Sequence, residues 1–271
     1  MERFKIVFTD LDRTLLRDDN TLSQRNRSAL ERLKKKGIRV VIATGRNLFS
    51  FHKVMHSDLP IDYLMLSSGC GIIDWETKQV IYENHLSQDQ ADRVFEIMQA
   101  YKLDFMIHHL IPDNHHFSFI RNNRNNADFE HRIQIYRDYA EEMVIKPLNA
   151  SQFIAILPPE AIKLFETVKN EIDFLQVIRA TSPLDHRSIW LEVFPKGISK
   201  GHSAQWLCTH LGIDRKQTLG IGNDFNDIDL LDFTAQSFVV ANAPEEIKGI
   251  YDVVDSNQND GFAKCIEELL G

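Results

Sequence analysis

A short apolar run near the start of the chain constrains the fold more than any other feature. Residues 6–8 are Ile-Val-Phe, which is typical of a buried strand, and Asp10 and Asp12 follow. If the extended conformation continues, both carboxylates project from the same face. In an open sheet of parallel strands, ligands bind beyond the carboxyl ends of the strands. Two acids at that edge either repel one another or share a cation, although a solvated acidic turn would explain this stretch equally well.

Strand and helix patterns alternate in the first and last parts of the chain. Gly37 and Gly212 are placed to end two of the helices, and residues 71–83 have the pattern of a hairpin. Strands are expected at residues 6–8, 38–43, 62–66, 218–221, 237–241 and 252–254. This alternation predicts an α/β fold with a Rossmann-like, doubly wound parallel sheet.

The pattern changes between residues 84 and 190, where hairpins mix with helices. Ser87 and Gln90 have capping-box spacing before a helix that reaches about Tyr101. Strands are expected at 104–109, 116–121, 152–157, 175–180 and 188–194, and helices at 129–140 and 161–172. The mixture predicts an α+β domain at 84–190, inserted into a core formed by residues 1–83 and 191–271.

The composition excludes several classes of protein. The 271 residues are 43% hydrophobic and 26% charged, as in ordinary globular proteins, and the length favours two domains. A net charge of −8 argues against nucleic acid as the main partner. Three cysteines without a CxxC pair favour a reducing compartment, and no apolar run approaches the ~20 residues of a membrane span. We therefore expect a cytoplasmic protein with neither a signal peptide nor a membrane anchor.

Polar residues follow the expected strands at points that a parallel sheet brings to one edge. Mg²⁺ prefers oxygen ligands, which Asp10, Asp224 and Asp227 carry. Thr44 precedes an amide run that suits a phosphate group, and Lys200 adds a compact positive charge. Such a site favours phosphoryl transfer, with one carboxylate as the nucleophile.

Each of these residues also has a plainer interpretation. Thr44 alone would more often cap a helix, and Lys200 alone would more often be a solvated surface lysine. Two pairs of neighbouring histidines at 108–109 and 115–116 suggest a metal site, but strand alternation would send neighbours to opposite faces. A hairpin that contacts substrate explains these histidines better.

Four sequence motifs together resemble those of the haloacid dehalogenase superfamily. The motifs are Asp10-x-Asp12-x-Thr14, Thr44-Gly45-Arg46, Lys200 and Gly222-Asn223-Asp224-x-Asn226-Asp227. Their order covers essentially the whole chain. The long insertion between Thr44 and Lys200 resembles the type II cap in its Cof-like, subclass B form, which is typical of sugar-phosphate phosphatases.

The resemblance implies a role for each matching residue. Asp10 would attack phosphorus and form an aspartyl-phosphate. Asp12 would protonate the leaving alcohol and then activate water, and its main-chain carbonyl would bind Mg²⁺. The implied substrate-binding residues are Thr44, Gly45, Arg46, Lys200 and Asn226, and the implied metal ligands are Asp10, Asp12, Asn223, Asp224 and Asp227.

The last motif departs from the family at one position. The usual motif begins Gly-Asp, whereas here Asn223 follows Gly222 and Asp224 comes one residue later. Either the Asn223 amide oxygen ligates the metal or the Asp224 carboxylate rotates in, and the sequence leaves both open.

The expected function is hydrolysis of small phosphorylated metabolites, sugar phosphates above all, by a Mg²⁺-dependent phosphatase. Two alternatives stay open: a phosphomutase of sugar phosphates, and a non-catalytic phospho-ligand-binding protein with a weakened metal site. A phospho-accepting receiver module is disfavoured, because such modules are about half this length and lack an inserted domain. The sequence identifies neither the substrate nor any protein partner.

Overall fold

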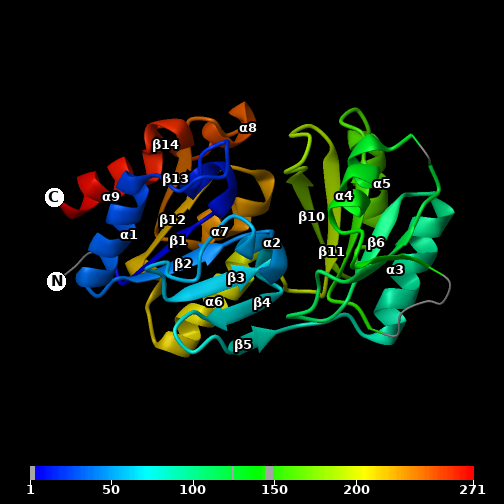
Figure 1. Cartoon of the computed structure of the whole chain (residues 1–271), viewed down its shortest axis with the longest axis horizontal. Coiled ribbons are helices and arrows are strands. Elements are labelled where there is room, and N and C mark those ends of the chain that lie inside the picture. The colour runs from blue at the N-terminus through cyan, green and yellow to red at the C-terminus, as the bar shows by residue number, and fades with distance from the viewer. Residues whose placement is uncertain (1–3, 124, 144–148) are drawn as a thin grey trace. The chain divides into compact units, whose positions relative to one another are not determined.

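The chain divides into two compact units (Figure 1) in the computed structural model, which describes residues 4–123, 125–143 and 149–271. Unit 1 comprises Met1–Tyr82 and Ser199–Gly271, and unit 2 comprises Glu83–Ile198. The chain returns to unit 1 after residue 198, whereas the sequence analysis predicts a boundary at 190/191. That prediction is wrong in position, because β11 (Ile189–Phe194) pairs with strands of unit 2 along its length.

Unit 1 is built on a sheet that contains eight strands within the described ranges, in the order β14-β13-β12-β1-β2-β3-β4-β5. The strands from β14 to β3 are parallel, and β4 runs antiparallel to β3. The bounds are β1 (Ile6–Thr9), β2 (Arg39–Ala43), β3 (Tyr63–Leu66), β4 (Gly71–Asp74), β5 (Val80–Glu83), β12 (Thr218–Gly222), β13 (Gln236–Val240) and β14 (Asp252–Val254). The predicted α/β fold is confirmed, with the expected hairpin at one edge.

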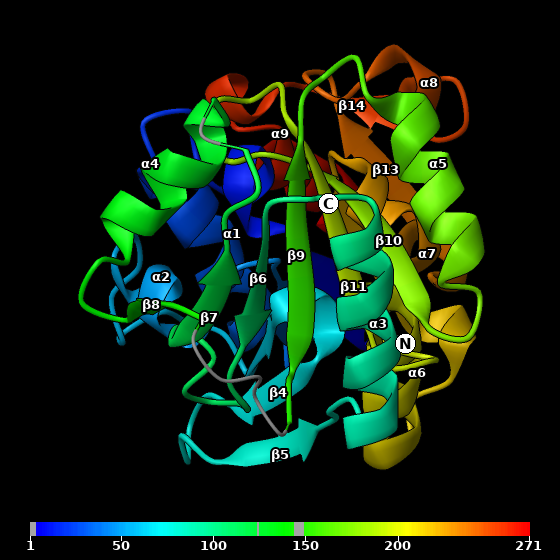
Figure 2. The same cartoon turned by 90° about the vertical axis from the view of Figure 1, so that its right-hand side faces the viewer.

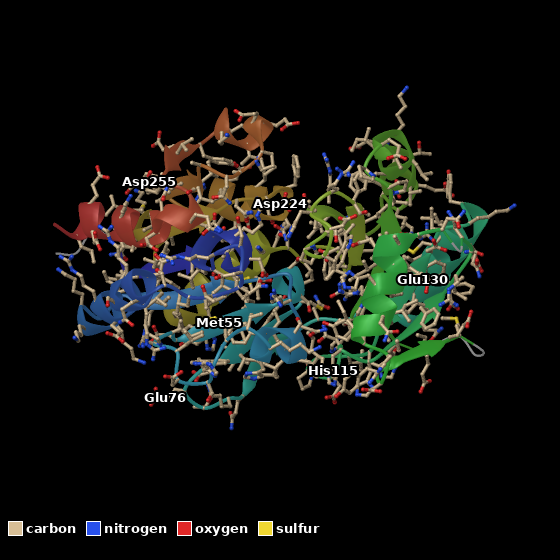
Figure 3. The ribbon with its side chains drawn as sticks, turned by 45° about the horizontal axis from the view of Figure 1, so that its top comes forward. Met55, Glu76, His115, Glu130, Asp224 and Asp255 are labelled. Atoms are coloured by element: carbon tan, nitrogen blue, oxygen red, sulfur yellow. The ribbon has the colours of Figure 1, made fainter. Side chains whose placement is uncertain are left out.

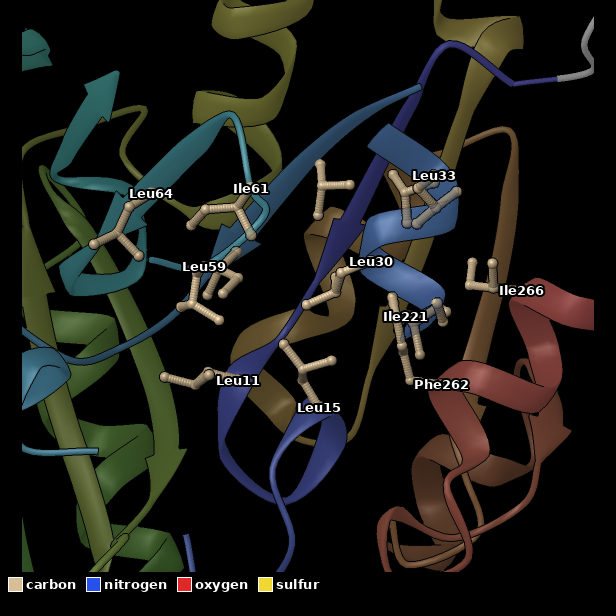
Figure 4. Packing of buried hydrophobic residues seen from close by; sticks show 14 of the residues in the cluster. Leu11, Leu15, Leu30, Leu33, Leu59, Ile61, Leu64, Ile221, Phe262 and Ile266 are labelled. Atoms are coloured by element: carbon tan, nitrogen blue, oxygen red, sulfur yellow. The ribbon is translucent and has the colours of Figure 1, made fainter. Parts of the chain in front are cut away.

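Helices cover both faces of this sheet, which explains why β1 is apolar on both sides. Val7 packs in a cluster with Leu30 and Phe262, and Figure 4 labels the latter two. Phe8 packs in a second cluster with Leu207. The helices of unit 1 are α1 (Gln24–Lys35), α2 (Leu48–His52), α6 (Lys200–Leu211), α7 (Ile228–Phe233), α8 (Glu245–Lys248) and α9 (Gly261–Leu270). Single helical turns lie at Leu11–Leu15, Ser67–Gly69, Arg215–Gln217, Phe225–Asp227 and Asn257–Asn259.

Unit 2 contains a mixed sheet whose described strands follow the order β10-β11-β9-β6-β7-β8. The helices α3 and α5 pack on one face of it (Figure 2), through a shared apolar cluster. The expected capping box forms at the start of α3, where Ser87 and Gln90 exchange hydrogen bonds. The bounds are α3 (Gln88–Ala100), β6 (Phe105–His108), β7 (Phe117–Ile120), α4 (Ala127–Ile135), β8 (Ala140–Glu142), β9 (Gln152–Leu157), α5 (Ile162–Glu171), β10 (Gln176–Thr181) and β11.

The prediction of a helix at residues 129–140 is wrong at its C-terminal end. The helix α4 ends at Ile135, and β8 pairs parallel with β7. The Phe117 N–H donates to the Tyr139 carbonyl at 3.1 Å, so a neighbouring strand takes backbone groups that a longer helix would have used internally. Among the described residues, no helix is both long and apolar enough to cross a bilayer.

The hairpin of β6 and β7 buries one histidine and exposes its neighbour. His108 is 2% exposed and its Nδ1 lies 2.7 Å from the Asn114 carbonyl oxygen, whereas His109 is exposed. Burial, together with the nearby Arg132 cation, lowers the pKa of His108 to about 3 from its ordinary value of 6.5. The folded protein therefore holds this imidazole neutral at pH values where the unfolded chain protonates it.

We expect His108 to make the protein less stable as the pH falls. Because its pKa is depressed in the folded state, its contribution is complete above pH 6.5 and is lost as the pH falls toward 3. At pH 5 the loss is about 2 kcal/mol in the free energy of unfolding. Urea unfolding measures the free energy of unfolding at pH 7.5 and at pH 5. The decrease between the two pH values should be smaller for His108→Gln than for the wild type. His109→Gln is the control, and an equal difference in both variants would contradict the assignment.

Candidate active site

The carboxyl ends of three neighbouring parallel strands meet in unit 1. In the sheet, β1 lies between β12 and β2, so Asp10, Thr44 and Asn223 each follow a strand at the same edge. The Asp10 N–H donates to the Ile221 carbonyl at 2.9 Å, which extends the β1–β12 pairing to the first carboxylate. Three of the predicted polar strand ends are therefore brought together by the register of the sheet.

Lys200 joins two carboxylates at this edge. It is the first residue of α6 and is 0% exposed, so the interpretation as a solvated surface lysine is wrong. Its Nζ donates to Asp10 Oδ1 at 2.7 Å and to Asp227 Oδ1 at 2.6 Å. A positive charge at a helix start opposes the helix dipole, and these two carboxylates supply the compensation.

Asp227 is held in place on both of its oxygens. While Oδ1 accepts from Lys200, Oδ2 accepts from the N–H groups of Asn223 at 2.8 Å and Asp224 at 3.0 Å. This packing needs a glycine at Gly222, because a Cβ there would lie 2.7 Å from the Asp227 Cβ. These partners make Asp227 the support of Lys200 and of the turn, and its predicted role as a metal ligand receives no support from them.

The buried charges shift the pKa values of the bridge. Burial raises the pKa of Asp10 to about 7; Lys200 opposes this, and the carboxylates of Asp227 and Asp12 add to it. Burial alone would lower the pKa of Lys200, but Asp10 and Asp227 outweigh it and hold that pKa above the ordinary value. A further positive charge beside Asp10 would favour the ionised carboxylate that a nucleophile requires.

Asp12 and Arg46 form a two-pronged ion pair. Arg46 Nε lies 2.8 Å from Asp12 Oδ2, and its Nη2 lies 2.7 Å from Asp12 Oδ1. The same guanidinium donates to the Ser50 carbonyl at 3.1 Å, which ties it to α2. Such a fork fixes the direction of the carboxylate as well as its charge. The sequence analysis predicts that Arg46 binds substrate, whereas its guanidinium binds Asp12 here.

A tight turn after β2 brings Thr44, Gly45 and Asn226 close together. Asn47, and not Thr44, caps α2, so the interpretation of Thr44 as a helix cap is wrong. The buried Thr44 hydroxyl accepts from the Arg46 N–H at 3.1 Å, and its carbonyl accepts from the Ser68 N–H at 3.0 Å. A Cβ on Gly45 would lie 3.7 Å from both Asn226 Nδ2 and Ser68 Oγ. Gly45 therefore lies close to two polar side chains, a grouping whose chemistry suits a small anion.

Asn223 lies among the oxygens of the first motif, and Asp224 caps a helical turn. In one orientation of the amide, Asn223 Oδ1 accepts from Thr14 Oγ1 at 3.1 Å. Asp224 lies in the turn after β12 and is labelled in Figure 3; its carboxylate accepts from the Phe225 N–H at 2.8 Å. Thr14 received no role from the sequence; its place in the first motif was the only signal for this contact.

The residues at this edge fit a magnesium ion, although with little negative charge. Within the described ranges, no group of three or more His, Cys, Asp or Glu side chains could hold a metal ion. One atom of the Asn223 amide, the one that faces the first motif, however, lies 3.2 Å from Asp10 Oδ2 and 3.3 Å from the Asp12 main-chain carbonyl oxygen. One carboxylate, one carbonyl and one amide form an oxygen donor set of the kind that Mg²⁺ accepts.

Removing the Lys200 charge should destabilise the protein strongly. We expect Lys200→Met to lower the free energy of unfolding by about 3–5 kcal/mol, because it leaves two buried carboxylates without a cation. The control is Lys248→Met, which breaks a pair of similar length with Glu245 on the surface and should cost under about 1 kcal/mol. Urea unfolding measures both, and equal effects would contradict the dominance of the buried bridge.

The chain is similar to known proteins along almost its whole length. A family model described as haloacid dehalogenase-like hydrolase matches residues 7–266. A Haemophilus influenzae protein named "Putative phosphatase" is 25% identical and aligns over 98% of each chain. The solved structure of a phosphatase of this superfamily from Bacteroides thetaiotaomicron has a TM-score of 0.80 at 21% identity, over 98% of this chain and 95% of that one.

Another solved structure, entitled a HAD subclass IIB sugar phosphatase, has a TM-score of 0.77 at 21% identity and covers 97% of this chain and 98% of its own. The structural likenesses show the fold, and the family match shows the membership. Together with the curated relative, they confirm the resemblance predicted from the four motifs. The chain belongs to the haloacid dehalogenase-like hydrolases and is an enzyme of the phosphatase type.

Proposed function

We propose that the chain is a Mg²⁺-dependent phosphatase of small phosphorylated metabolites, above all sugar phosphates, with Asp10 as its nucleophile. The observation that carries this proposal is the position of Asp10, a buried carboxylate at a strand end. One of its oxygens is held by Lys200 at 2.7 Å, and the other lies 3.2 Å from the Asn223 amide. A carboxylate oriented on both oxygens loses little freedom when it attacks.

In the first half of the proposed reaction, an Asp10 oxygen bonds to phosphorus as the bond to the substrate alcohol breaks. Asp12 gives its proton to the leaving oxygen, which departs as an alcohol, and an aspartyl-phosphate remains. Thr44, Gly45 and Asn226 surround the phosphoryl group, and Lys200 offsets its negative charge. A bound Mg²⁺ would add positive charge at the phosphoryl oxygens; Asp10, the Asp12 carbonyl and Asn223 would hold it.

In the second half, water replaces the alcohol. The Asp12 carboxylate accepts a proton from the water as its oxygen bonds to phosphorus, and the bond from phosphorus to Asp10 breaks. Inorganic phosphate leaves, Asp10 is again a carboxylate, and Asp12 is again protonated. The enzyme therefore returns to its starting state with one water consumed.

We propose unit 2 as the domain that selects the substrate. It is inserted between Thr44 and Lys200, as caps of type II are, and the related subclass IIB structure is that of a sugar phosphatase. We also propose that the activity is cytoplasmic, since Cys70, Cys208 and Cys265 are buried thiols, which suit a reducing compartment. The net charge of −8 supports a small-molecule partner over nucleic acid.

Arg46 offers a first test of this mechanism, because its guanidinium holds Asp12 and its proposed effect is on positioning. We expect Arg46→Lys to lower kcat about 10- to 100-fold and to change KM less than about threefold, since a lysine cannot form the fork. Steady-state phosphate release measures both constants. A large rise in KM with an unchanged kcat would instead make Arg46 a substrate-binding residue, as the sequence analysis predicts.

The central test is phosphate release from a panel of phosphorylated sugars and other metabolites, with Mg²⁺ and with EDTA. We expect Mg²⁺-dependent release that favours sugar phosphates. Asp10→Asn should abolish it with the circular dichroism unchanged, whereas Asp58→Asn, an exposed control, should keep it. Retained activity in Asp10→Asn would exclude the nucleophile assignment. Isomerised sugar phosphate without phosphate release would indicate a phosphomutase.

A further inference from the structure

We propose that the side-chain amide of Asn223 flips when Mg²⁺ binds, so that Oδ1 and Nδ2 exchange places. In the metal-free protein the amide donates hydrogen bonds, and in the metal-bound protein it ligates Mg²⁺ through its oxygen. The proposal rests on the proposed function and concerns the same site. It assigns Asn223 a second task, which is to stabilise the edge of the sheet when no cation is there. The consequence is a stable metal-free enzyme that binds Mg²⁺ weakly.

The hydrogen-bond partners of the amide carry the proposal. When the amide oxygen of Asn223 points toward the first motif (the outward orientation), it faces three other oxygens: Asp10 Oδ2, the Asp12 main-chain carbonyl oxygen and the Thr14 hydroxyl. With its nitrogen outward, the amide donates toward the same atoms at 3.2, 3.3 and 3.1 Å. Only the hydroxyl can donate to an outward oxygen, so in the absence of a cation the second orientation satisfies more of these groups.

A cation reverses this preference. Oxygens that crowd together without protons repel one another, and a metal ion at their centre removes the repulsion. Octahedral Mg²⁺ with ligands at roughly 2.0–2.1 Å places neighbouring oxygens about 3 Å apart. The separations of 3.2 and 3.3 Å around the Asn223 amide are close to that spacing, so a half-turn of the amide suffices to exchange one state for the other.

The alternative ligand, Asp224, is engaged elsewhere. Its carboxylate accepts from the Phe225 N–H at 2.8 Å and caps the helical turn Phe225–Asp227. Rotating it toward Asp10 would give up that cap and bring a further negative charge to a carboxylate that already has Asp12 and Asp227 nearby. Asn223 needs no such rearrangement, because its amide already contacts the first motif.

The choice of an amide over a carboxylate has opposite effects on the two states. A carboxylate at residue 223 would stand next to Asp10 Oδ2 and the Asp12 carbonyl without the N–H groups that the amide donates to them, which destabilises the metal-free protein. It would also add one negative charge to the donor set, which strengthens Mg²⁺ binding. Asn223→Asp therefore tests both halves of the proposal at once.

The experiment compares wild type and Asn223→Asp by thermal unfolding, in EDTA and across a Mg²⁺ series, with calorimetric titration of Mg²⁺. In EDTA we expect the midpoint of Asn223→Asp to lie about 3–6 °C below that of the wild type. Its Mg²⁺ dissociation constant should be about tenfold lower, and saturating Mg²⁺ should restore most of the lost midpoint. An equal or higher midpoint in EDTA, or unchanged Mg²⁺ affinity, would overturn the proposal.

Asn257→Asp is the matched control. The Asn257 amide is buried and donates to the Leu16 carbonyl at 3.0 Å and to Asp18 Oδ1 at 3.0 Å, so its replacement also sets a carboxylate against a carbonyl and an aspartate. We expect this variant to lose stability in EDTA while its Mg²⁺-induced shift equals that of the wild type. A larger shift would mean that Mg²⁺ rescues any buried carboxylate, which would overturn the assignment to Asn223.

The two proposals fail in different ways. If the wild type releases phosphate with Mg²⁺ but Asn223→Asp is as stable as the wild type in EDTA, the flip of the Asn223 amide is excluded and the phosphatase function stands. If the stability and affinity pattern holds but no panel substrate is hydrolysed, the binding inference stands and the proposed substrate class fails.

Discussion

A single buried ammonium group connects the elements on which the candidate site depends. Lys200 brings its charge from the start of α6 to Asp10 after β1 and to Asp227 after β12, and 190 residues separate it from Asp10. Each of these charges would be costly to bury alone, so the three segments must come together for any of them to be buried. The adjacency of β12 and β1 in the sheet, and the glycine at Gly222 that admits Asp227, follow the same requirement.

Two further contacts organise the side chains around this bridge. Arg46 holds the Asp12 carboxylate in a fork, and Asn223 contacts Asp10 and the Asp12 carbonyl. In the proposed mechanism the first would align the Asp12 carboxylate for proton transfer, and the second places a neutral amide beside Asp10, where the proposed cation would bind. The cation of Arg46 offsets the charge of Asp12, and the neutral amide of Asn223 adds no charge beside Asp10. Limiting the net negative charge in this way makes it less costly to bury neighbouring acids.

Much of the fold follows from patterns within short segments. The apolar runs at β1, β2 and β12, and the capping box at Ser87 and Gln90, predicted elements that the structure contains. The family match confirms the resemblance carried by the four motifs. The boundary at 190/191 and the helix end at Ala140 were wrong because β11 and β8 are defined by pairing with strands elsewhere in unit 2, and no local pattern records a partner.

The sequence by itself determined which residues gather at the edge of unit 1, since parallel strands joined by helices place all their carboxyl ends together. Only the tertiary structure decided what each side chain does there. It buried Lys200, directed the Arg46 guanidinium to Asp12, and put Asn223 rather than Asp224 against Asp10. The physical reason is distance. The position of a strand end depends on topology, whereas a hydrogen bond depends on atoms from remote segments that meet within about 3 Å.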